Sequence, residues 1–554
     1  MSVYGVVGAR VRTMAAGAPD ATALAVEDGV LVAVGTDEEV REVVGARGPI
    51  FDVGGRTVLP GFIDTHTHVE MTALSRHVWT DVRGLSRDAV LELVAAEVRR
   101  KPPGGWVIGQ ATFGQDLPTK AELDAVAPEH CVALRWSMHK FVVNEQVLRA
   151  AGIDASFVAP PGMRAQRDQH GALNGVLEEA WDLLTAPAPS RAELSAALEE
   201  TLGSLFLANG VTTVHEIGYS REGIDVLQEL AGSGRAPRLG VLLTLAPGHQ
   251  PLADLSRDAV RAGGAAGADR FWYHGYKIFM DGGRDGAFRG NQLDLPAERW
   301  GLLTRLYPTL VNELYRATDA RVQVYVHAIG DLSQELAVSA VERISALFPD
   351  LDHRIRIEHF FNESYGTDLL DRLVAAGGLA APNPGFVIAE PDDPARRLPE
   401  GASKYALRTL LERQHRLPGN SDTAGAQPFT TNPWFTMRCM LELTNKNGVA
   451  VNPSERIDLE AALRAFTVDA AYSTFADQVR GSLEAGKLAD FIVIDRDPFE
   501  IEVSELTSIT TLATIVGGDV LHGSLEGTHP RATSNPPLTS VLAGPNTRAE
   551  DRSE

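Results

Sequence analysis

The chain reads Gly61-Phe62-Ile63-Asp64-Thr65-His66-Thr67-His68 at the end of a short apolar segment. Side chains two residues apart on a β-strand point to the same face, so both imidazoles can approach one metal ion from the end of a strand. Imidazole is a common ligand of zinc and of similar divalent metals. On its own this spacing is a moderate signal, because most such pairs are ordinary surface or core histidines. The rest of the sequence must decide between the two interpretations.

Composition and charge describe a large acidic chain. It has 554 residues, 44% of them hydrophobic, which predicts a sizeable core in two or more domains or in one large barrel with additions. Its net charge of -22 disfavours nucleic acid and anionic membrane surfaces as partners. The two cysteines, Cys131 and Cys439, are too few for a disulfide framework and are typical of a reducing cytoplasm, where we expect the protein to act. Met1-Ser2-Val3-Tyr4 does not predict a secretory signal, and no apolar run is long enough to span a bilayer.

Both ends of the chain predict short strands. Residues 3–7, 23–27 and 31–34 are β-rich, and Asp28-Gly29 between the last two is a strong hairpin signal. The same texture returns at residues 491–494 and 512–516. We therefore expect the two ends to form the halves of one small β-sandwich.

The middle of the chain alternates between helices and strands. Ser190 and Glu193 predict a capping box before an amphipathic helix, Asn209-Gly210 ends that helix, and a strand follows at residues 211–216. The alternation recurs around predicted strands at residues 271–279, 322–326 and 354–358. This repetition predicts an α/β fold with a (β/α)₈ barrel.

These patterns divide the chain into four parts. Residues 1–60 are the first half of the sandwich, and residues 479–528 are its second half. The barrel occupies residues 61–478 and carries an inserted segment around residues 70–190. Residues 529–554 are rich in Pro, Ser, Thr and charge, which predicts a disordered tail.

Polar residues of metal-ligand or acid–base type stand where the predicted strands end. They are His215, Lys277, His327, His359 and Asp422. The carboxyl ends of barrel strands converge on one mouth, so residues far apart in sequence meet there. Lys277, His327, His359 and Asp422 predict one metal site together with His66 and His68, whereas His215 ends a strand of its own.

These motifs resemble the amidohydrolase superfamily of metal-dependent hydrolases, and within it amidohydrolase family 3, the branch that includes the YtcJ-like proteins and N-substituted formamide deformylase. The resemblance covers nearly all of the chain before the predicted tail. Its strongest segments are residues 60–68, 139–144, 326–331, 356–359 and 481–490. It implies a distorted (β/α)₈ TIM barrel, a flanking β-sandwich built from both chain ends, and one or two divalent metal ions, for which we expect zinc.

The resemblance also implies roles for individual residues. His66 and His68 are similar in position to the family's ligands of a first metal, and His327 and His359 to its ligands of a second. Asp422 corresponds to the remaining ligand of the first metal and to the catalytic acid/base.

Lys277 corresponds to the lysine that the family carboxylates with CO₂ to bridge two metals. A physical reason supports this role, because two close cations need a bridging anion and would repel an ammonium group. Burial and metals lower the pKa of a lysine, and the neutral amine can then add CO₂.

Two loops depart from the family pattern. Gly283-Arg284-Asp285-Gly286 follows Asp281-Gly282, and Thr423-Ala424-Gly425-Ala426 follows Asp422 where the family usually has tryptophan and proline. Both loops are expected at the mouth, so the substrate stays open. Candidate substrate-binding residues are His139, Asn144, His215 and Arg284. The guanidinium of Arg284 can hold a carboxylate bidentately, whereas His139 and Asn144 either shape the pocket or brace the inserted segment.

We predict a metal-dependent hydrolase that cleaves a C–N bond in a small amide through a metal-activated water, with Asp422 as general acid/base. Lactone or ester hydrolysis and decarboxylation on the same scaffold are alternatives, and a non-catalytic binding protein is a third class. The expected partners are a small-molecule substrate and a second copy of the chain in a homodimer, without nucleic acid or membrane.

Overall fold

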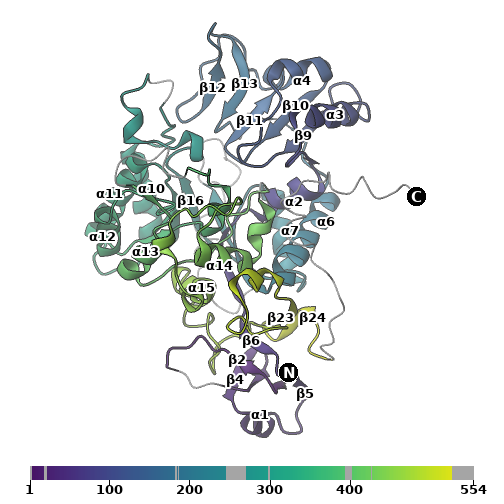
Figure 1. Cartoon of the computed structure of the whole chain (residues 1–554), viewed down its shortest axis with the longest axis vertical. Coiled ribbons are helices and arrows are strands. Elements are labelled where there is room, and N and C mark those ends of the chain that lie inside the picture. The colour runs from purple at the N-terminus through teal and green to yellow at the C-terminus, as the bar shows by residue number, and fades with distance from the viewer. Residues whose placement is uncertain are drawn as a thin grey trace.

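The computed structural model describes residues 3–17, 21–180, 184, 186–244, 270–296, 300–393, 402–425 and 427–526 (Figure 1). The tail predicted at residues 529–554 lies outside them. Over the described part of the chain, we find no helix that combines the length and the apolar character needed to cross a membrane.

Seven parallel strands form the central sheet. In spatial order they are β20 (Leu379–Ala381), β18 (Arg356–Glu358), β17 (Gln323–His327), β16 (Phe271–Phe279), β15 (Arg238–Thr244), β14 (Val211–Ile217) and β7 (Phe62–Thr67). The α/β class is as predicted, and the sheet supplies seven strands of the expected barrel. Beyond the free edge of β7, residues 419–423 exchange backbone hydrogen bonds with it. The amide of Thr65 donates to Gly419 at 3.2 Å, and the amide of Asp422 donates to the carbonyl of His66 at 2.9 Å.

Helices follow or precede these strands and cover the sheet. They are α2 (Val69–His77), α6 (Arg191–Thr201), α7 (Arg221–Gly232), α10 (Tyr307–Asp319), α11 (Asp331–Leu347), α12 (Asp368–Ala375), α13 (Leu407–Gln414), α14 (Pro433–Glu442), α15 (Leu459–Ala465) and α16 (Val468–Ser473). The capping box predicted at Ser190 and Glu193 is present at the start of α6.

The central strands are buried on both faces. Every residue of β7, β14, β15 and β17 is buried, which is the burial expected of a parallel sheet covered by helices. Such strands should be continuously apolar, yet β7 and β17 contain the buried histidines His66 and His327 near their carboxyl ends. Buried polar groups of this kind need partners or a function.

Two further sheets lie at one end of the molecule, at the bottom of Figure 1. One has the order β4-β3-β1-β5, and the other has the order β2-β6-β22-β23-β24. Their bounds are β1 (Val3–Val7), β2 (Arg10–Val11), β3 (Ala23–Glu27), β4 (Val30–Gly35), β5 (Ile50–Asp52), β6 (Thr57–Pro60), β22 (Phe491–Ile494), β23 (Thr511–Val516) and β24 (Asp519–Gly523), with α1 (Asp37–Val44) packed on β1. In the second sheet, β6 from the start of the chain pairs antiparallel with β22 from its end.

The hairpin predicted at Asp28-Gly29 is confirmed. Glu27 faces Val30 across β3 and β4, and the two turn residues have φ of +52° and +81°. These values suit the tight turn that Asp-Gly favours. A Cβ on Gly29 would lie 2.8 Å from the carbonyl oxygen of Gly517, so the position also requires the small residue.

A six-stranded sheet lies at the opposite end, at the top of Figure 1, within the range of the predicted insertion. Its order is β12-β13-β11-β10-β9-β8, with bounds β8 (Thr80–Asp81), β9 (Trp106–Gln110), β10 (Cys131–Arg135), β11 (Lys140–Val143), β12 (Arg164–Arg167) and β13 (Leu173–Glu178). Helices α3 (Arg87–Val98), α4 (Lys120–Val126) and α5 (Glu145–Ala150) belong to the same segment. Residues at the ends of its strands line one cavity together with residues from the central sheet.

One buried ion pair joins the central sheet to the β22 region. Nε of Arg238, in β15, donates to Oδ2 of Asp490 at 2.8 Å, and Nη2 donates to Oδ1 at 3.0 Å. The side chains are only 2% and 4% exposed. Breaking a buried pair by removing one partner leaves an uncompensated charge.

Asp490→Ala should therefore lower the free energy of unfolding by about 3–5 kcal/mol. Thermal unfolding of the purified variant measures the loss. Asp519→Ala is the matched control, because Asp519 pairs with Arg270 at 2.8 Å but its side chain is 70% exposed; it should cost less than about 1 kcal/mol. An equal loss of unfolding free energy in the two variants would contradict the stabilising role of the Arg238–Asp490 pair.

Candidate metal centre

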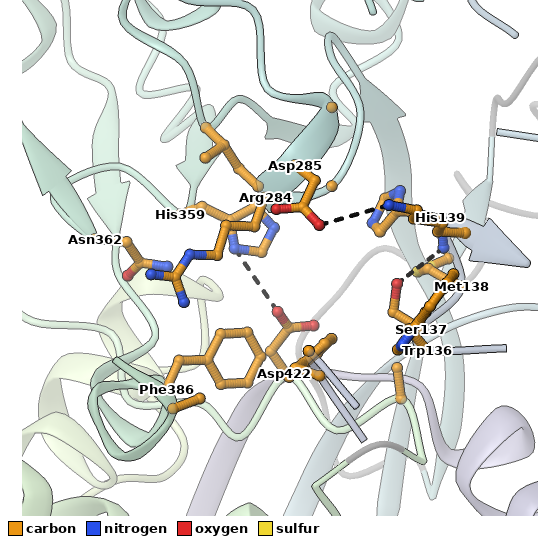
Figure 2. A pocket seen from close by; sticks show the side chains of 18 of the residues that line it. Trp136, Ser137, Met138, His139, Arg284, Asp285, His359, Asn362, Phe386 and Asp422 are labelled. Atoms are coloured by element: carbon orange, nitrogen blue, oxygen red, sulfur yellow. Dashed lines mark hydrogen bonds and ion pairs between the residues drawn. The ribbon is translucent and has the colours of Figure 1, made fainter. Parts of the chain in front are cut away.

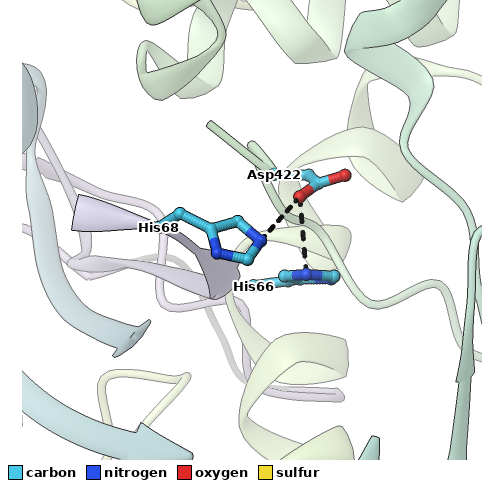
Figure 3. Close-up of side chains that lie close together, drawn as sticks. All are labelled: His66, His68 and Asp422. Atoms are coloured by element: carbon cyan, nitrogen blue, oxygen red, sulfur yellow. Dashed lines mark ion pairs between the residues drawn. The ribbon is translucent and has the colours of Figure 1, made fainter. Parts of the chain in front are cut away.

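Three potential ligands meet at the carboxyl end of β7. His66 is in the strand, His68 follows it as the N-cap residue of α2, and Asp422 comes from the segment that pairs with β7. One oxygen of Asp422, Oδ1, lies 3.4 Å from Nε2 of His66 and 3.5 Å from Nε2 of His68. The three ligand atoms all lie within 4.8 Å of one another. Figure 3 shows both imidazoles turned towards the carboxylate of Asp422. This is the geometry expected if one ion sits between them.

The other predicted ligands lie beside this group. Nζ of Lys277 is 3.0 Å from Nε2 of His66, and Nδ1 of His359 is 3.7 Å from Oδ2 of Asp422. The rings of His327 and His359 have their centroids 4.4 Å apart. All six predicted ligands line one cavity of about 910 Å³. The structure therefore brings together every residue of the predicted set.

Hydrogen bonds orient the histidine rings. Nδ1 of His66 lies 2.6 Å from Oε2 of Glu358, and a carboxylate only accepts, so the proton is on Nδ1 and Nε2 presents its lone pair. Glu358 accepts in turn from Nε of Arg356 at 2.8 Å. In the same way, Nδ1 of His359 donates to the amide oxygen of Asn383 at 2.6 Å, which leaves its Nε2 for a ligand.

Glu358, Arg356 and Asn383 are functional candidates that the sequence analysis missed. Arg356 and Glu358 are two apart on β18, so they share one face of the strand, and this spacing is the signal that could have found them. Asn383 follows β20, and no comparable sequence spacing marks it as a functional residue.

The electrostatics of the cluster suit a cation. Burial, with nearby Lys277, lowers the pKa of His66 well below its usual value, and burial likewise lowers that of His359 to about 4. These imidazoles are neutral at pH 7 and can donate lone pairs. Burial alone would raise the pKa of Asp422, but positive charge on its neighbours, His66 first, lowers it below the usual range; with His66 neutral, a bound cation would supply that charge. Neutral nitrogen donors around an ionised carboxylate fit a divalent metal.

Lys277 is completely buried, and that burial lowers its pKa to about 8. A sizeable fraction of the amine is then neutral near physiological pH, which is the form that can react with CO₂.

Backbone conformation at the site is unusual. Asp422 has φ of +42° and His359 has φ of +68°, both in the left-handed region that non-glycine residues rarely adopt. Such conformations cost of order 1–3 kcal/mol each and persist where the surrounding structure enforces them. They place the two side chains face to face across the cluster, as Figure 2 shows.

The predicted substrate-binding residues divide into two pairs. His139 and Arg284 line the cavity, whereas its described lining does not include Asn144 or His215. Arg284 donates from Nη2 to Oε2 of Glu390 at 2.6 Å, so a substrate carboxylate would share this guanidinium with a protein carboxylate.

Asn144 and His215 occupy structural positions. Asn144 is the N-cap residue of α5, and its Oδ1 accepts from the amides of Val147 and Val132, so it braces the inserted sheet. His215 is buried in β14, with its ring centroid 4.6 Å from that of His274 and 5.7 Å from that of Trp272. The structure thus does not bring these two residues to the cavity.

The cavity lies between the central sheet and the inserted sheet. Trp136, Ser137, Met138 and His139 come from the inserted segment, and Arg284, Phe386 and Asp422 from loops at the carboxyl edge of the central sheet (Figure 2). A molecule bound at the ligand cluster would therefore contact both parts of the chain.

Substitution of single histidines should distinguish the metal ligands from other buried histidines. His68→Ala should lose divalent metal on dialysis, because two of the three clustered ligand atoms cannot hold the ion as tightly. His215→Gln should retain it, since His215 lies outside the cavity. Elemental analysis of the dialysed proteins measures their metal content. Retention of metal by His68→Ala would show that His68 is not a ligand.

The chain is similar to known proteins over most of its length. A family model described as "Amidohydrolase family" matches residues 50–522. N-substituted formamide deformylase from Arthrobacter pascens is 28% identical, with 93% of this chain and 97% of that protein covered. The putative amidohydrolase YtcJ from Bacillus subtilis is 26% identical, with 90% and 96% covered.

Among solved structures, an uncharacterized metal-dependent hydrolase from Pyrococcus horikoshii is similar with a TM-score of 0.68 and 20% identity, with 91% of this chain and 99% of that chain covered. An adenosine deaminase from Xanthomonas campestris with bound zinc is similar with a TM-score of 0.53 and 15% identity, with 94% and 92% covered. At these identities the likeness concerns the fold alone. The match across residues 50–522 confirms the predicted family, and the chain belongs to the amidohydrolase family.

Proposed function

We propose that this protein is a metal-dependent hydrolase that cleaves the C–N bond of a small amide. Family membership supports hydrolase activity. The observation that carries the proposal is the convergence of His66, His68 and Asp422 within 4.8 Å in a cavity of about 910 Å³. A volume of this size suits a small molecule. The relative from Arthrobacter pascens is named for an amide substrate, which favours a C–N bond.

We further propose the ligand assignment. His66, His68 and Asp422 would hold a first divalent ion, zinc being the best fit to two imidazoles and a carboxylate. His327 and His359 would hold a second ion where one is present. Lys277, carboxylated by CO₂, would bridge the two. The buried amine 3.0 Å from Nε2 of His66 supports the bridging role, because a carboxylated Lys277 would place an anion beside the ligands.

A divalent metal at this site would lower the pKa of a water molecule towards about 7 and polarise the scissile carbonyl. Asp422 would take the proton of the attacking water and return it to the leaving nitrogen. Its carboxylate is placed for this work, because Oδ1 lies 3.4 Å from Nε2 of His66 and 3.5 Å from Nε2 of His68, beside the position proposed for the ion. The walls of the cavity, Arg284 among them, would bind the remainder of the substrate.

The proposed scaffold is a closed barrel. Residues 419–423 pair with β7 on one side, and on the other Nδ2 of Asn420 donates to the carbonyl of Pro382 at 2.8 Å. Nδ2 of Asn383 also donates to Oδ1 of Asn420 at 2.7 Å. These contacts support residues 419–423 as the segment that closes the sheet between β20 and β7. The sandwich and the inserted sheet would be additions to this barrel.

Turnover of three substrate panels (amides, lactones and carboxylic acids) tests the reaction class. Zinc-loaded protein should hydrolyse one or more N-formyl or N-acetyl amides of small amines, release the free amine, and lose this activity when a chelator strips the metal. Activity on lactones without activity on amides would assign the site to ester chemistry. Release of CO₂ from carboxylic acids would assign the site to decarboxylation. The absence of turnover on every panel would favour a non-catalytic binding protein.

Asp422→Asn tests the acid/base role. Asparagine keeps the shape and one oxygen ligand but cannot accept the proton, so kcat should fall by about 10²–10⁴-fold while zinc content is largely retained. Asp469→Asn is the control, because Asp469 is a buried carboxylate of α16 outside the cavity; its turnover should stay near wild type. Retained turnover in Asp422→Asn would place the base elsewhere.

Lys277→Ala tests the bridge. The variant should lose metal and activity, and acetate or propionate should restore part of both by supplying the missing carboxylate. Wild-type protein equilibrated with ¹³C-labelled bicarbonate should give a carbamate signal by NMR that is absent in the variant. Full metal content and activity in Lys277→Ala would contradict the proposal that Lys277 bridges two metal ions.

A further inference from the structure

The inserted sheet presents a second pair of ionisable side chains to the cavity. His139 directly precedes β11, and Glu179 directly follows β13. These strands pair antiparallel with Lys140 opposite Glu178, so His139 and Glu179 face each other one step further along. The amide of Glu179 donates to the carbonyl of His139 at 2.9 Å and continues the ladder.

The side chains of the pair are in direct contact. Nδ1 of His139 lies 2.9 Å from Oε1 and 3.1 Å from Oε2 of Glu179. Glu179 has φ of +54°, an unfavourable conformation for a side chain of this size. The strained backbone directs its carboxylate back to the imidazole. A carboxylate that accepts from one ring nitrogen fixes the tautomer and the orientation of the imidazole.

Glycines in the loop after β16 accommodate the pair. A Cβ on Gly283 would lie 2.9 Å from the ring of His139, and a Cβ on Gly282 would lie 3.0 Å from Oε1 of Glu179. The amide of Gly283 also donates to Oε1 of Glu179 at 3.3 Å. The loop that follows the Lys277 strand is thus shaped to receive these two residues.

The imidazole of His139 is adjacent to the candidate ligands. Its ring centroid is 5.1 Å from that of His327, and both residues line the cavity with Glu179. Figure 2 shows His139 across the cavity from His359 and Asp422. A substrate whose scissile bond reaches Asp422 and His327 would therefore have its neighbouring polar atoms within reach of His139.

We propose that His139 and Glu179 form a substrate-binding dyad, in which Nε2 of His139 hydrogen-bonds the scissile amide and Glu179 is the positioning residue. The proposal rests on the proposed function and adds a specific task for the inserted sheet. The competing explanation is a purely structural contact, in which the pair only holds the edge of the inserted sheet against the loop after β16. The two differ in whether the residues act on substrate as one unit.

A mutant cycle on zinc-loaded protein separates these explanations. His139→Ala should lower kcat/KM by about 100-fold, the loss expected for one hydrogen bond to the reacting group, with zinc content and the Co²⁺ absorption spectrum unchanged. Glu179→Ala should lower it by about 10-fold through loss of orientation, and Glu179→Gln, which still accepts from Nδ1, should recover most of the loss. The double variant should be no worse than His139→Ala, because Glu179 acts through His139.

His130→Ala is the matched control. His130 is a buried histidine of the same inserted segment, and its Nε2 lies 3.2 Å from the carbonyl of Lys101. The His130→Ala variant should keep kcat/KM within about 2-fold of wild type, because His130 does not line the cavity. Equal losses in His139→Ala and Glu179→Ala, each with a lowered melting temperature, would identify a purely structural contact, and multiplicative losses in the double variant would show that the two residues act independently. Loss of zinc in His139→Ala would identify a metal ligand. Each of these results overturns the dyad.

A binding measurement keeps the test independent of turnover. Acetohydroxamic acid is a small amide-like carbonyl compound that chelates divalent metals, and calorimetry on the zinc-loaded protein gives its affinity. His139→Ala should weaken binding by about 10-fold, the cost of one hydrogen bond, whereas His130→Ala should not change it. Equal affinity in wild type and His139→Ala, or binding to neither, overturns the dyad. If no amide is hydrolysed but this difference is present, the proposed reaction fails and the dyad stands.

Discussion

The hydrogen bond between Nδ1 of His66 and the carboxylate of Glu358, at 2.6 Å, orients the centre on which the rest of the site depends. It joins two strands of one parallel sheet, β7 and β18, and turns Nε2 of His66 towards Lys277 and Asp422. Arg356 donates to Glu358 from the same strand and holds the carboxylate in position. Because all three groups are buried, loss of one would leave a charge or a donor without its partner in a region of low dielectric constant. The sheet therefore carries an oriented polar network where an apolar core would be expected.

Each part of the chain contributes differently to the cavity. The central sheet supplies the candidate ligands from strand ends, where parallel strands bring distant residues together. The inserted sheet supplies one wall and the His139–Glu179 pair. The sheets that contain the chain ends lie at the far side and are tied to the central sheet by the Arg238–Asp490 pair. Such an arrangement lets the ligand set stay fixed while loops and insertion adapt the wall to a substrate.

Several elements of the fold and the candidate ligands could be predicted from the sequence. Alternation and turn chemistry gave β16 with its bounds, the Asp28-Gly29 hairpin and the Ser190 capping box, because these depend on neighbouring residues. The six candidate ligands could be chosen because strand ends and a family resemblance identify them, and the structure brings them into one cavity. Their roles as ligands stay predictions.

Other features depend on contacts between distant segments. Glu358, Asn383 and Glu179 act through partners on other strands or loops, so no local spacing marks them all. Asn144 has the residue type of a ligand-binding group, yet helix capping uses the same amide oxygen. His215 ends an apolar strand as the ligands do, but it lies beside Trp272 and His274 and away from the cavity. Position along a strand is therefore not sufficient, because depth within the sheet decides which strand-end residues reach the cavity.

The central claim is that His66, His68 and Asp422 are the ligands of one metal ion. Crystals of the protein grown with zinc, measured at wavelengths on both sides of the zinc absorption edge, test it most directly. The account predicts an anomalous peak about 2.0–2.2 Å from Nε2 of both histidines and from a carboxylate oxygen of Asp422. Zinc bound only elsewhere, with the ammonium of Lys277 still in contact with Nε2 of His66, would contradict it.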